Sequence, residues 1–563
     1  MQTVAAFLVK YPELAVYLTI AAGYLIGRIR VGRISFGPVT GSLFAGLLIG
    51  QLADIPIAPM AKSILFVLFL FGIGYSVGPQ FMQSLKRDGL KPMLLAVVVC
   101  VTGLLGATAM AKLLRLDPGY AAGLLSGALT ESPAIGTATE AISHLPLPEA
   151  QRQLYASHVA VADAVCYLFG VIIVIVFLTE VAPRLMKIDL HAEALELERK
   201  YGIQRSRANL FSAWRRFEMR AYRLGADSPA AGAPVSAAEE RGARHARLFV
   251  QRVRRGDEII EADPTFVLQP GDVVAVSGPR DTLVSLLGDG PQEVEDQLLL
   301  DVPVATVDVL LTNRDLAGRT LEQLAQGEWT RSLYLRAITR GGEKLPLAPG
   351  ITLERGDIVH LVGPETIIER AASRIGPIIA PTTDTDFVSL GLAIFLGGLV
   401  GVLVAVPIGD TRISLSSSVG VLLAGLAVGH LRTRFPLFGR IPDGAINLMT
   451  SLGLAAFVGM VGLHAGPIFF PALAEAGLGL LFGGMVVTAT PMVVGLLFGR
   501  FVLRMNPVLL LGALAGSQTM TAGMAAVQAR SGSPVAVLGY TPAYPLGHIL
   551  LTTWGTVIVG LMA

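Results

Sequence analysis

The chain has 563 residues, of which 53% are hydrophobic and 15% charged, with a formal net charge of +2. This balance excludes the basic surface of a nucleic-acid-binding protein. The charges are concentrated, because 26 of the 44 Lys and Arg and 28 of the 42 Asp and Glu lie within residues 184–383. Apolar runs of about 20 residues, long enough to cross a bilayer as helices, flank this segment. The sequence predicts an α-helical polytopic protein of the lipid bilayer with a soluble insert, and excludes a soluble enzyme.

The first apolar run, residues 1–27, lacks a charged start and a small-residue cleavage site, which favours a retained first helix over a signal peptide. The two cysteines, Cys100 and Cys166, both lie inside apolar runs. Such placement excludes a disulfide framework or a structural zinc site. We expect neither a metal nor a cofactor.

The two apolar blocks, residues 1–186 and 381–563, repeat each other. Three matches occur in the same order in both blocks: Arg33-Ile34-Ser35 with Arg412-Ile413-Ser414, Gly74-x3-Gly78-Pro79 with Gly462-x3-Gly466-Pro467, and Gly123-x3-Gly127 with Gly512-x3-Gly516. Small residues recur in any helical membrane protein, since they let helices approach closely. The shared order instead indicates an internal duplication.

Cations follow different helices in the two blocks. Arg28, Arg30 and Arg33 follow the first predicted helix of block one, whereas Arg432 and Arg434 follow the second predicted helix of block two. Because Lys and Arg gather on the cytoplasmic side, the same element faces opposite sides in the two halves. This pattern predicts inverted-topology repeats in the inner membrane, with both termini outside and the insert in the cytoplasm.

One segment of each repeat is interrupted by glycine or proline, at residues 119–142 and 507–528. Interrupted helices at membrane depth persist only where protein or water satisfies the backbone. We therefore predict five crossings plus one re-entrant or broken helix per repeat; the alternative is six plain crossings with parallel halves. The residues expected to break the helices are Gly127, Pro133, Gly136, Gly516 and Gly523.

The charged insert is predicted to be α+β. Residues 187–247 form a linker, and two small modules follow at residues 248–291, with a start as early as 206 possible, and 292–380. Each module has a Gly-Asp turn, at Asp272 and Asp357, between short strands, with a helix expected after Gly278-Pro279 and after Gly363-Pro364. We interpret Asp272 and Asp357 as solvated turn residues.

Polar residues cluster in the two interrupted segments, where burial in the membrane makes each a functional candidate. A half-helix N-terminus favours a carboxylate, so the cluster predicts a site for a small anion or zwitterion. Glu131 is suited to an ammonium group or a proton. For any single Ser or Thr, the alternative is a bond back to its own helix. The predicted substrate-binding residues are Ser126, Thr130, Glu131, Ser132, Thr137, Ser517, Gln518, Thr519 and Thr521.

Other polar residues of the apolar blocks have weaker signals. Asp163 and His158 are candidate charge partners for the substrate, with a salt bridge to a neighbouring helix as the alternative. We interpret His464 and His548 as packing residues. No nucleophile–base constellation is present, so we predict no catalytic residue.

The duplicated blocks, with Gly127-Ala128-Leu129-Thr130-Glu131-Ser132 and Gly516-Ser517-Gln518-Thr519, resemble the aspartate–alanine exchanger family. The insert resembles tandem TrkA-C (RCK-C) modules. The resemblance implies electrogenic exchange of L-aspartate for L-alanine by a homodimer. Some aspartate-transporting members carry Arg where this chain has Ser76, which keeps a succinate-type dicarboxylate exporter open. The regulator-like insert suggests a third possibility, a ligand-gated cation channel, although no Thr-Val-Gly-Tyr-Gly filter occurs.

Overall fold

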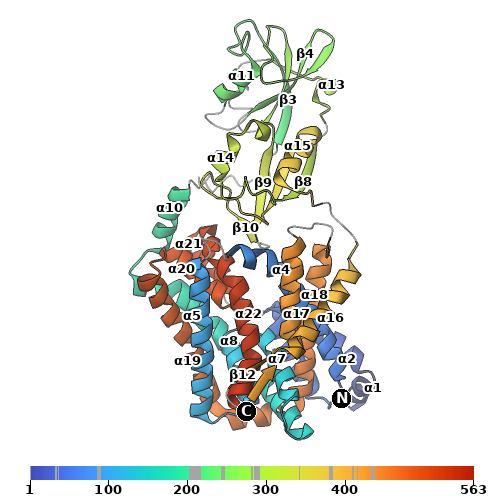
Figure 1. The fold of residues 1–563 in the computed structure, drawn as a ribbon, viewed down its shortest axis with the longest axis vertical. Coiled ribbons are helices and arrows are strands. Elements are labelled where there is room, and N and C mark those ends of the chain that lie inside the picture. Colours follow the sequence, from blue (N-terminus) through green and yellow to red (C-terminus); the bar gives the residue numbers. More distant parts are fainter. Residues whose placement is uncertain are drawn as a thin grey trace.

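A computed structural model shows a helical bundle beneath two stacked β-sheet modules (Figure 1). Both termini lie at the end of the bundle away from these modules. The structure describes residues 2–31, 34–35, 37–84, 90–201, 217–242, 248–279, 283, 292–302, 304–340, 343–379, 384–408, 411–414, 416–432 and 438–563. The cations Arg33 and Arg434 lie outside the described residues.

The first repeat begins with four helices and a short hairpin, and ends with two long helices around a broken one. Its helices are α1 (Gln2–Lys10), α2 (Pro12–Gly27), α3 (Pro38–Gly50), α4 (Pro59–Ser84), α5 (Leu90–Leu114), α6 (Pro118–Ala128), α7 (Pro133–Ser143), α8 (Glu149–Val176), the π-helical η1 (Phe177–Val181) and α9 (Ala182–Met186). The hairpin β1 (Arg30–Val31) and β2 (Ile34–Ser35) joins α2 to α3.

The second repeat follows the same plan. Its elements are α16 (Phe387–Leu403), β12 (Ala405–Ile408), β13 (Thr411–Ser414), α17 (Ser417–Arg432), α18 (Asp443–Ala465), η3 (Gly466–Ile468), α19 (Phe469–Leu497, interrupted at Gly477), η4 (Phe498–Val502), α20 (Pro507–Ser517), α21 (Thr521–Ser531), η5 (Pro534–Ala536) and α22 (Val537–Met562). Within the described residues, six helices are long and apolar enough to cross a membrane, and α3, α16, α17 and α20 are shorter apolar helices.

Close contacts between glycine-bearing helices show how the repeats are oriented. A Cβ added to Gly74 would lie 2.2 Å from the carbonyl oxygen of Leu422, and one added to Gly78 would lie 2.3 Å from that of Leu426, so α4 and α17 run parallel. In the same way, Gly46 and Gly50 approach successive turns of α18, so α3 and α18 run parallel. In the matching sets α2, α3, α4 and α16, α17, α18, helix α4 is third and α17 is second. Consecutive crossings are antiparallel, so repeats of equal orientation would place α4 antiparallel to α17. The predicted inverted topology is confirmed.

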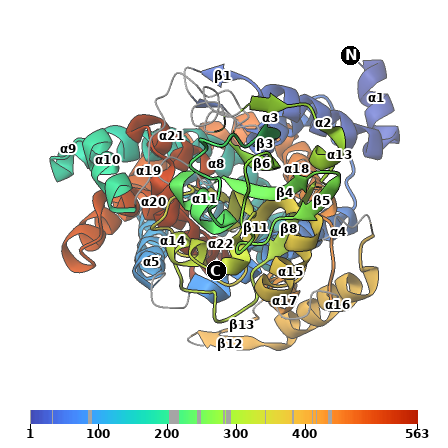
Figure 2. The ribbon, with the colours of Figure 1, turned by 90° about the horizontal axis from the view of Figure 1, so that it is seen from above.

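The helices form two units. The first, which we call the scaffold unit, contains α2, α3, α4, α16, α17 and α18; the second, the broken-helix unit, contains α5 to α8 and α19 to α22. Seen from above, α5, α19 and α20 lie on one side of the molecule and α2, α4 and α16 on the other (Figure 2). Each unit therefore takes matching helices from both repeats.

The soluble modules have sheets of matching strand order, β5-β4-β6-β3 with β7 added at the edge and β10-β9-β11-β8. The strands are β3 (Phe217–Arg223), β4 (Phe249–Arg255), β5 (Glu258–Glu261), β6 (Val273–Pro279), β7 (Gln292–Val294), β8 (Val304–Leu310), β9 (Tyr334–Arg340), β10 (Glu343–Leu345) and β11 (Ile358–Pro364). The helices are α10 (Leu190–Tyr201), α11 (Val235–Gly242), α13 (Gln297–Leu300), α14 (Leu321–Ala325), η2 (Glu328–Thr330) and α15 (Glu365–Ile375). Thus α15 follows Gly363-Pro364 as predicted, whereas the helix expected after Gly278-Pro279 lies outside the described residues.

The interpretation of Asp272 and Asp357 as solvated turn residues is wrong. Their side chains are 3% and 0% exposed, respectively. Arg255 on β4 donates two hydrogen bonds, of 2.9 and 2.8 Å, to the carboxylate of Asp272, and Arg340 on β9 donates two, of 2.7 and 2.8 Å, to that of Asp357. The local sequence shows the turn but not the arginine on the neighbouring strand, which makes burial of the carboxylate possible.

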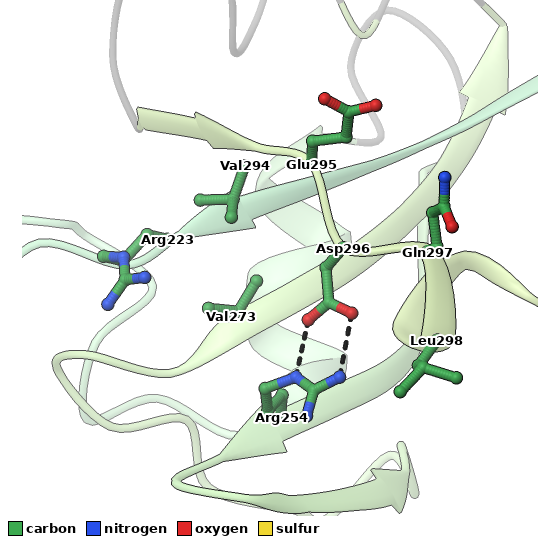
Figure 3. Close-up of a pocket in the computed structure, with 8 residues that line it drawn as sticks. All are labelled: Arg223, Arg254, Val273, Val294, Glu295, Asp296, Gln297 and Leu298. Carbon is green, nitrogen blue, oxygen red and sulfur yellow. Dashed lines mark hydrogen bonds and ion pairs between the residues drawn. The ribbon is translucent and has the colours of Figure 1, made fainter.

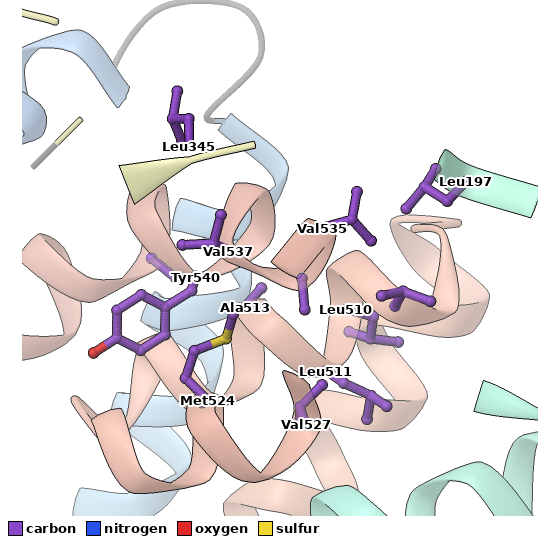
Figure 4. Close-up of a cluster of buried hydrophobic side chains, with 14 of the residues drawn as sticks. Leu197, Leu345, Leu510, Leu511, Ala513, Met524, Val527, Val535, Val537 and Tyr540 are labelled. Atoms are coloured by element: carbon purple, nitrogen blue, oxygen red, sulfur yellow. The ribbon is translucent and has the colours of Figure 1, made fainter. Parts of the chain in front are cut away.

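A hydrophobic cluster joins the second soluble module to the broken-helix unit (Figure 4). Leu345 on β10 and Leu197 on α10 belong to the same buried cluster as Leu510, Val535 and Val537 of the membrane helices. In addition, the backbone N–H of Gly350 donates to the carbonyl of Tyr201 at 3.0 Å. The second module therefore packs against α22, and α10 packs against the second broken helix.

Candidate functional site

Each repeat contributes a helix broken at the same point. The break between α6 and α7 contains Thr130 with φ 57°, and the break between α20 and α21 contains Thr519 with φ 53°. A β-branched residue in this left-handed region is uncommon and indicates a backbone held by its surroundings. Each pair begins alike, since Asp117 caps α6 and Asn506 caps α20, with a proline following each cap. The predicted broken helices are confirmed.

The two breaks meet at the carboxylate of Glu131, which is 1% exposed. Its Oε2 accepts a hydrogen bond of 2.5 Å from the hydroxyl of Thr519 in the other break. Its Oε1 accepts one of 3.0 Å from Thr552 on α22, and Nδ1 of His548, also on α22, lies 3.1 Å from the same oxygen. Glu131 therefore belongs to the first repeat, but its partners come from the second.

Two residues of the second repeat, Gln518 next to Thr519 in the chain and His548, have buried polar atoms without a hydrogen-bond partner. The side chain of Gln518 is fully buried, and within the described part of the chain neither its amide oxygen nor its amide nitrogen has a hydrogen-bond partner. The ring nitrogens of His548 are also buried and not aligned for a hydrogen bond to any described residue. Buried polar groups are normally paired, so such a group in the interior indicates a place for a ligand or water.

The helices beside the breaks satisfy the C-terminal ends of α6 and α20. Thr488 on α19 donates to the carbonyl of Ala128 at 2.8 Å, and Cys100 on α5 donates through sulfur to the carbonyl of Ser517 at 3.5 Å. These carbonyls occupy matching positions in the two repeats. The N-termini of α7 and α21 remain directed towards the breaks, and the first N–H groups of a helix have no partner within it.

The other predicted site residues are distributed around the breaks. Ser126 donates to Asp163 on α8 at 2.6 Å, and His158 forms an ion pair of 2.6 Å with Asp117 at the start of α6. Ser132 is buried at the N-cap of α7 without a capping bond from its side chain. Thr130 donates weakly to the carbonyl of Gln518 at 3.5 Å.

Three further hydroxyls are engaged in bonds within the broken-helix unit. Thr137 donates to the carbonyl of Thr552 at 2.6 Å, and Ser517 donates to the carbonyl of Ala513 in its own helix at 2.7 Å. Thr521 lies at an exposed position, with its hydroxyl 3.2 Å from that of Tyr540. The structure thus brings Glu131, Thr130, Gln518 and Thr519 together, and places these three hydroxyls in supporting contacts.

The predicted helix-breaking residues occupy close helix contacts. A Cβ on Gly127 would lie 2.7 Å from the carbonyl oxygen of Asp163, and one on Gly516 would lie 2.5 Å from that of Tyr540. Gly136 packs against the ring of Phe66, Gly523 against Leu178, and Pro133 is the first residue of α7. These contacts seat the first broken helix on α8 and the second on α22.

His548 and Thr552 were not recognised as site residues from the sequence. They are one helical turn apart on α22, but 417 and 421 residues beyond Glu131. A polar i, i+4 pair inside an apolar helix was the available signal. The sequence cannot show which helix that pair faces.

A second polar region lies on the first soluble module (Figure 3), lined by Arg223, Arg254, Val273, Val294, Glu295, Asp296, Gln297 and Leu298. Arg254 donates to both carboxylate oxygens of Asp296 at 2.5 and 2.8 Å. These hydrogen bonds hold the pKa of Asp296 below its usual value. Both groups are therefore already paired, and the region lacks the unpaired buried atoms seen at the helix breaks.

Inverted repeats with interrupted helices at the repeat interface are typical of membrane transporters. The chain belongs to the aspartate–alanine exchanger family: the family model described as "Predicted Permease Membrane Region" matches residues 15–183 and 389–560, and a TrkA-C domain matches residues 219–287 between them. No solved structure matches the chain.

Similar proteins support the same class. The chain is 60% identical to an uncharacterized transporter of Bradyrhizobium diazoefficiens over 511 residues, covering 91% of this chain and 99% of that protein. It is 40% identical to one of Bordetella parapertussis, with 98% and 96% covered, and 37% identical to one of Shewanella oneidensis, with 98% of each covered. The protein is thus a multi-pass membrane transporter.

Proposed function

We propose that the protein is a secondary antiporter that exchanges L-aspartate for L-alanine by alternating access, with one substrate site where the two helix breaks meet. The observation that carries this proposal is the pairing of Glu131 with Thr519 across the repeats, together with the fully buried and unpaired amide of Gln518, the residue before Thr519. A site shared by both repeats is exposed alternately when one group of helices moves against the other.

The chemistry of the breaks suits an amino acid. The carboxylate of Glu131 binds an ammonium group, and the amide of Gln518 donates to a carboxylate. The N-termini of α7 and α21 add backbone N–H groups and the positive ends of two helix dipoles. Alanine presents one carboxylate and aspartate two, so exchange of aspartate for alanine moves net charge.

The division into two units suggests how access alternates. The scaffold unit is held together by backbone-to-glycine contacts such as Gly46 with Gly459 and Gly74 with Leu422. The site lies entirely in the broken-helix unit. We propose that this unit moves relative to the scaffold, with the modules in the cytoplasm and both termini outside, in a homodimer of the inner membrane.

The experiment is counterflow in liposomes. Purified protein is reconstituted, the vesicles are loaded with alanine, and uptake of labelled aspartate is followed at controlled membrane potential. We expect uptake that depends on internal alanine and on the potential. Absence of uptake would contradict the proposed exchange.

Two variants test the site within this assay. Gln518→Ala removes the unpaired amide, and we expect a loss of about tenfold in exchange, the worth of one hydrogen bond of about 1.4 kcal/mol. Ser517→Ala is the matched control, because this neighbouring hydroxyl only bonds to Ala513 of its own helix. Equal exchange by Gln518→Ala and Ser517→Ala would remove Gln518 from the site.

A succinate-type dicarboxylate exporter is the second candidate. It is favoured by the two hydroxyls that already satisfy Glu131, since a satisfied carboxylate does not need a substrate ammonium. Ser76, where some aspartate transporters of the family have Arg, is exposed on α4 and donates to the carbonyl of Gly72 in its own helix. Internal succinate in place of alanine distinguishes the two candidates in the same vesicles.

A further inference from the structure

We propose that Glu131 and His548 together hold one proton in the substrate-free transporter, and that binding of a substrate ammonium group expels it. This inference rests on the proposed function and adds to it a proton that each bound amino acid displaces and that returns when the amino acid leaves. The juxtaposition that supports it is a buried carboxylate and a buried imidazole, 1% and 4% exposed, with Nδ1 of His548 3.1 Å from Oε1 of Glu131.

An isolated charge is costly in the interior of a membrane protein, so a carboxylate there needs a compensating positive charge or a proton. Among the described residues, the only ion-pair contact of Glu131 is with His548. The two groups are neutral as a pair when they share one proton, either as carboxylate with imidazolium or as carboxylic acid with imidazole.

A substrate ammonium group can displace His548 from Glu131 without breaking the other hydrogen bonds of the carboxylate. Oε2 of Glu131 is engaged with Thr519 at 2.5 Å, whereas Oε1 is shared between Thr552 and the imidazole. The imidazole is near this oxygen but not aligned for a hydrogen bond. A substrate ammonium that reaches Glu131 therefore competes with the imidazolium for Oε1, rather than with the strong bond from Thr519.

None of the titratable groups described around Glu131 and His548 supplies the positive charge that the carboxylate needs. Tyr544 stacks on His548 with ring centroids 5.9 Å apart, and Tyr167 on α8 and Cys100 on α5 interact electrostatically with Glu131. All three are neutral at physiological pH by their ordinary chemistry. The remaining buried acid nearby, Asp163, also interacts with Tyr167, and its carboxylate accepts from Ser126 at 2.6 Å.

The step is a simple proton transfer. As the ammonium binds the carboxylate of Glu131, two positive charges would lie side by side. The N–H bond of the imidazolium then breaks, and its proton passes to water on the side from which the substrate enters. His548 keeps the electron pair and becomes neutral. Release of the substrate on the other side allows the pair to take up a proton there.

The test measures protons at the moment of binding. Full-length protein in detergent and weak buffer is titrated with L-aspartate while a pH dye reports proton release, and binding is measured in parallel by calorimetry. We expect release of up to one proton per bound aspartate. Proton uptake, or binding without release, would overturn the proposal. Absence of aspartate binding would instead count against the proposed function.

Succinate provides a control that needs no substitution, because it has the same two carboxylates but no ammonium group. Bound succinate is expected to release no proton. Release by succinate equal to that by aspartate would show that the ammonium is not the displacing group and would overturn the proposal.

Substitution of the histidine locates the proton. His548→Gln is expected to bind aspartate without proton release, whereas His464→Gln, on α18 of the scaffold unit, releases protons as the original chain does. The apparent affinity for aspartate should rise about tenfold per pH unit while the pair is protonated, and His548→Gln should remove this dependence. Unchanged release by His548→Gln would overturn the assignment.

Discussion

The helix breaks and the Gly-Asp turns both occur twice in the chain. The two pairs differ in which features, backbone geometry or charge, their two copies share. At the turns, geometry and charge are both repeated: Gly271 and Gly356 have φ of 92° and 90°, and each following aspartate is paired with an arginine of the neighbouring strand. At the breaks, the backbone is repeated but the charge is not.

The asymmetry at the breaks supports the substrate site proposed at Glu131. Thr130 and Thr519 share their unusual backbone, yet Glu131 follows the first and Met520 the second. The carboxylate of the first repeat therefore accepts hydrogen bonds from hydroxyls of the second. Repeated chemistry is typical of structural support, because each copy stabilises its own module. A lone charge at the centre of a symmetric frame instead points to a ligand.

The largest loss of exchange is expected from substitution of Glu131, which has no charged counterpart in the second repeat. Glu131→Gln should lower aspartate–alanine exchange at least about 100-fold, since loss of a buried, hydrogen-bonded charge costs several kcal/mol. Met520→Leu, at the matching position of the second repeat, should stay within about twofold. Counterflow in liposomes measures both. Equal losses would mean that the breaks are functionally equivalent.

The turns should behave symmetrically. Asp272→Asn and Asp357→Asn each leave an arginine without its buried partner, and we expect each to destabilise its module by about 3 kcal/mol. Thermal unfolding of the purified full chain measures this loss. Exchange per folded molecule should be unchanged in both variants, and a silent result for either aspartate would contradict the symmetry of the two modules.

A smaller difference is expected between the two threonines of the breaks. Thr519→Ala removes a 2.5 Å bond to the carboxylate of Glu131 and should lower exchange about tenfold, as for one charge-assisted hydrogen bond. Thr130→Ala removes only the 3.5 Å contact with Gln518 and should cost less. Initial rates of counterflow for the two variants, normalised to folded protein, decide the order. The reverse order would place the substrate nearer the first break.

The smallest effect is expected at the helix caps. Asp117→Asn makes the cap of α6 resemble the Asn506 cap of α20 and removes the ion pair with His158. Because Asn caps about as well as Asp and the carboxylate is 22% exposed, we expect a loss of stability below about 1 kcal/mol. Thermal unfolding is again the measurement. A larger loss would show that this ion pair holds the first broken helix in place.

Much of the fold could be predicted from the sequence, because the signals are local. Apolar length predicted the crossings, and displaced arginines such as Arg28 and Arg432 predicted the inversion. Runs of glycine marked the two broken segments, although the breaks themselves lie at Thr130 and Thr519 and the predicted glycines lie inside the flanking helices. The contacts that define the site could not be predicted, since Glu131 and His548 are separated by more than 400 residues and meet only through packing of α7 on α22. Burial of Asp272 and Asp357 was missed for the same reason.

The most direct measurement is a cryo-electron microscopy structure of the protein with L-aspartate. We predict ligand density between the N-termini of α7 and α21, with the ammonium at Glu131 and a carboxylate at the amide of Gln518. Aspartate bound outside the breaks, for example on the soluble modules, with Gln518 still unpaired, would contradict a single site shared by the two repeats.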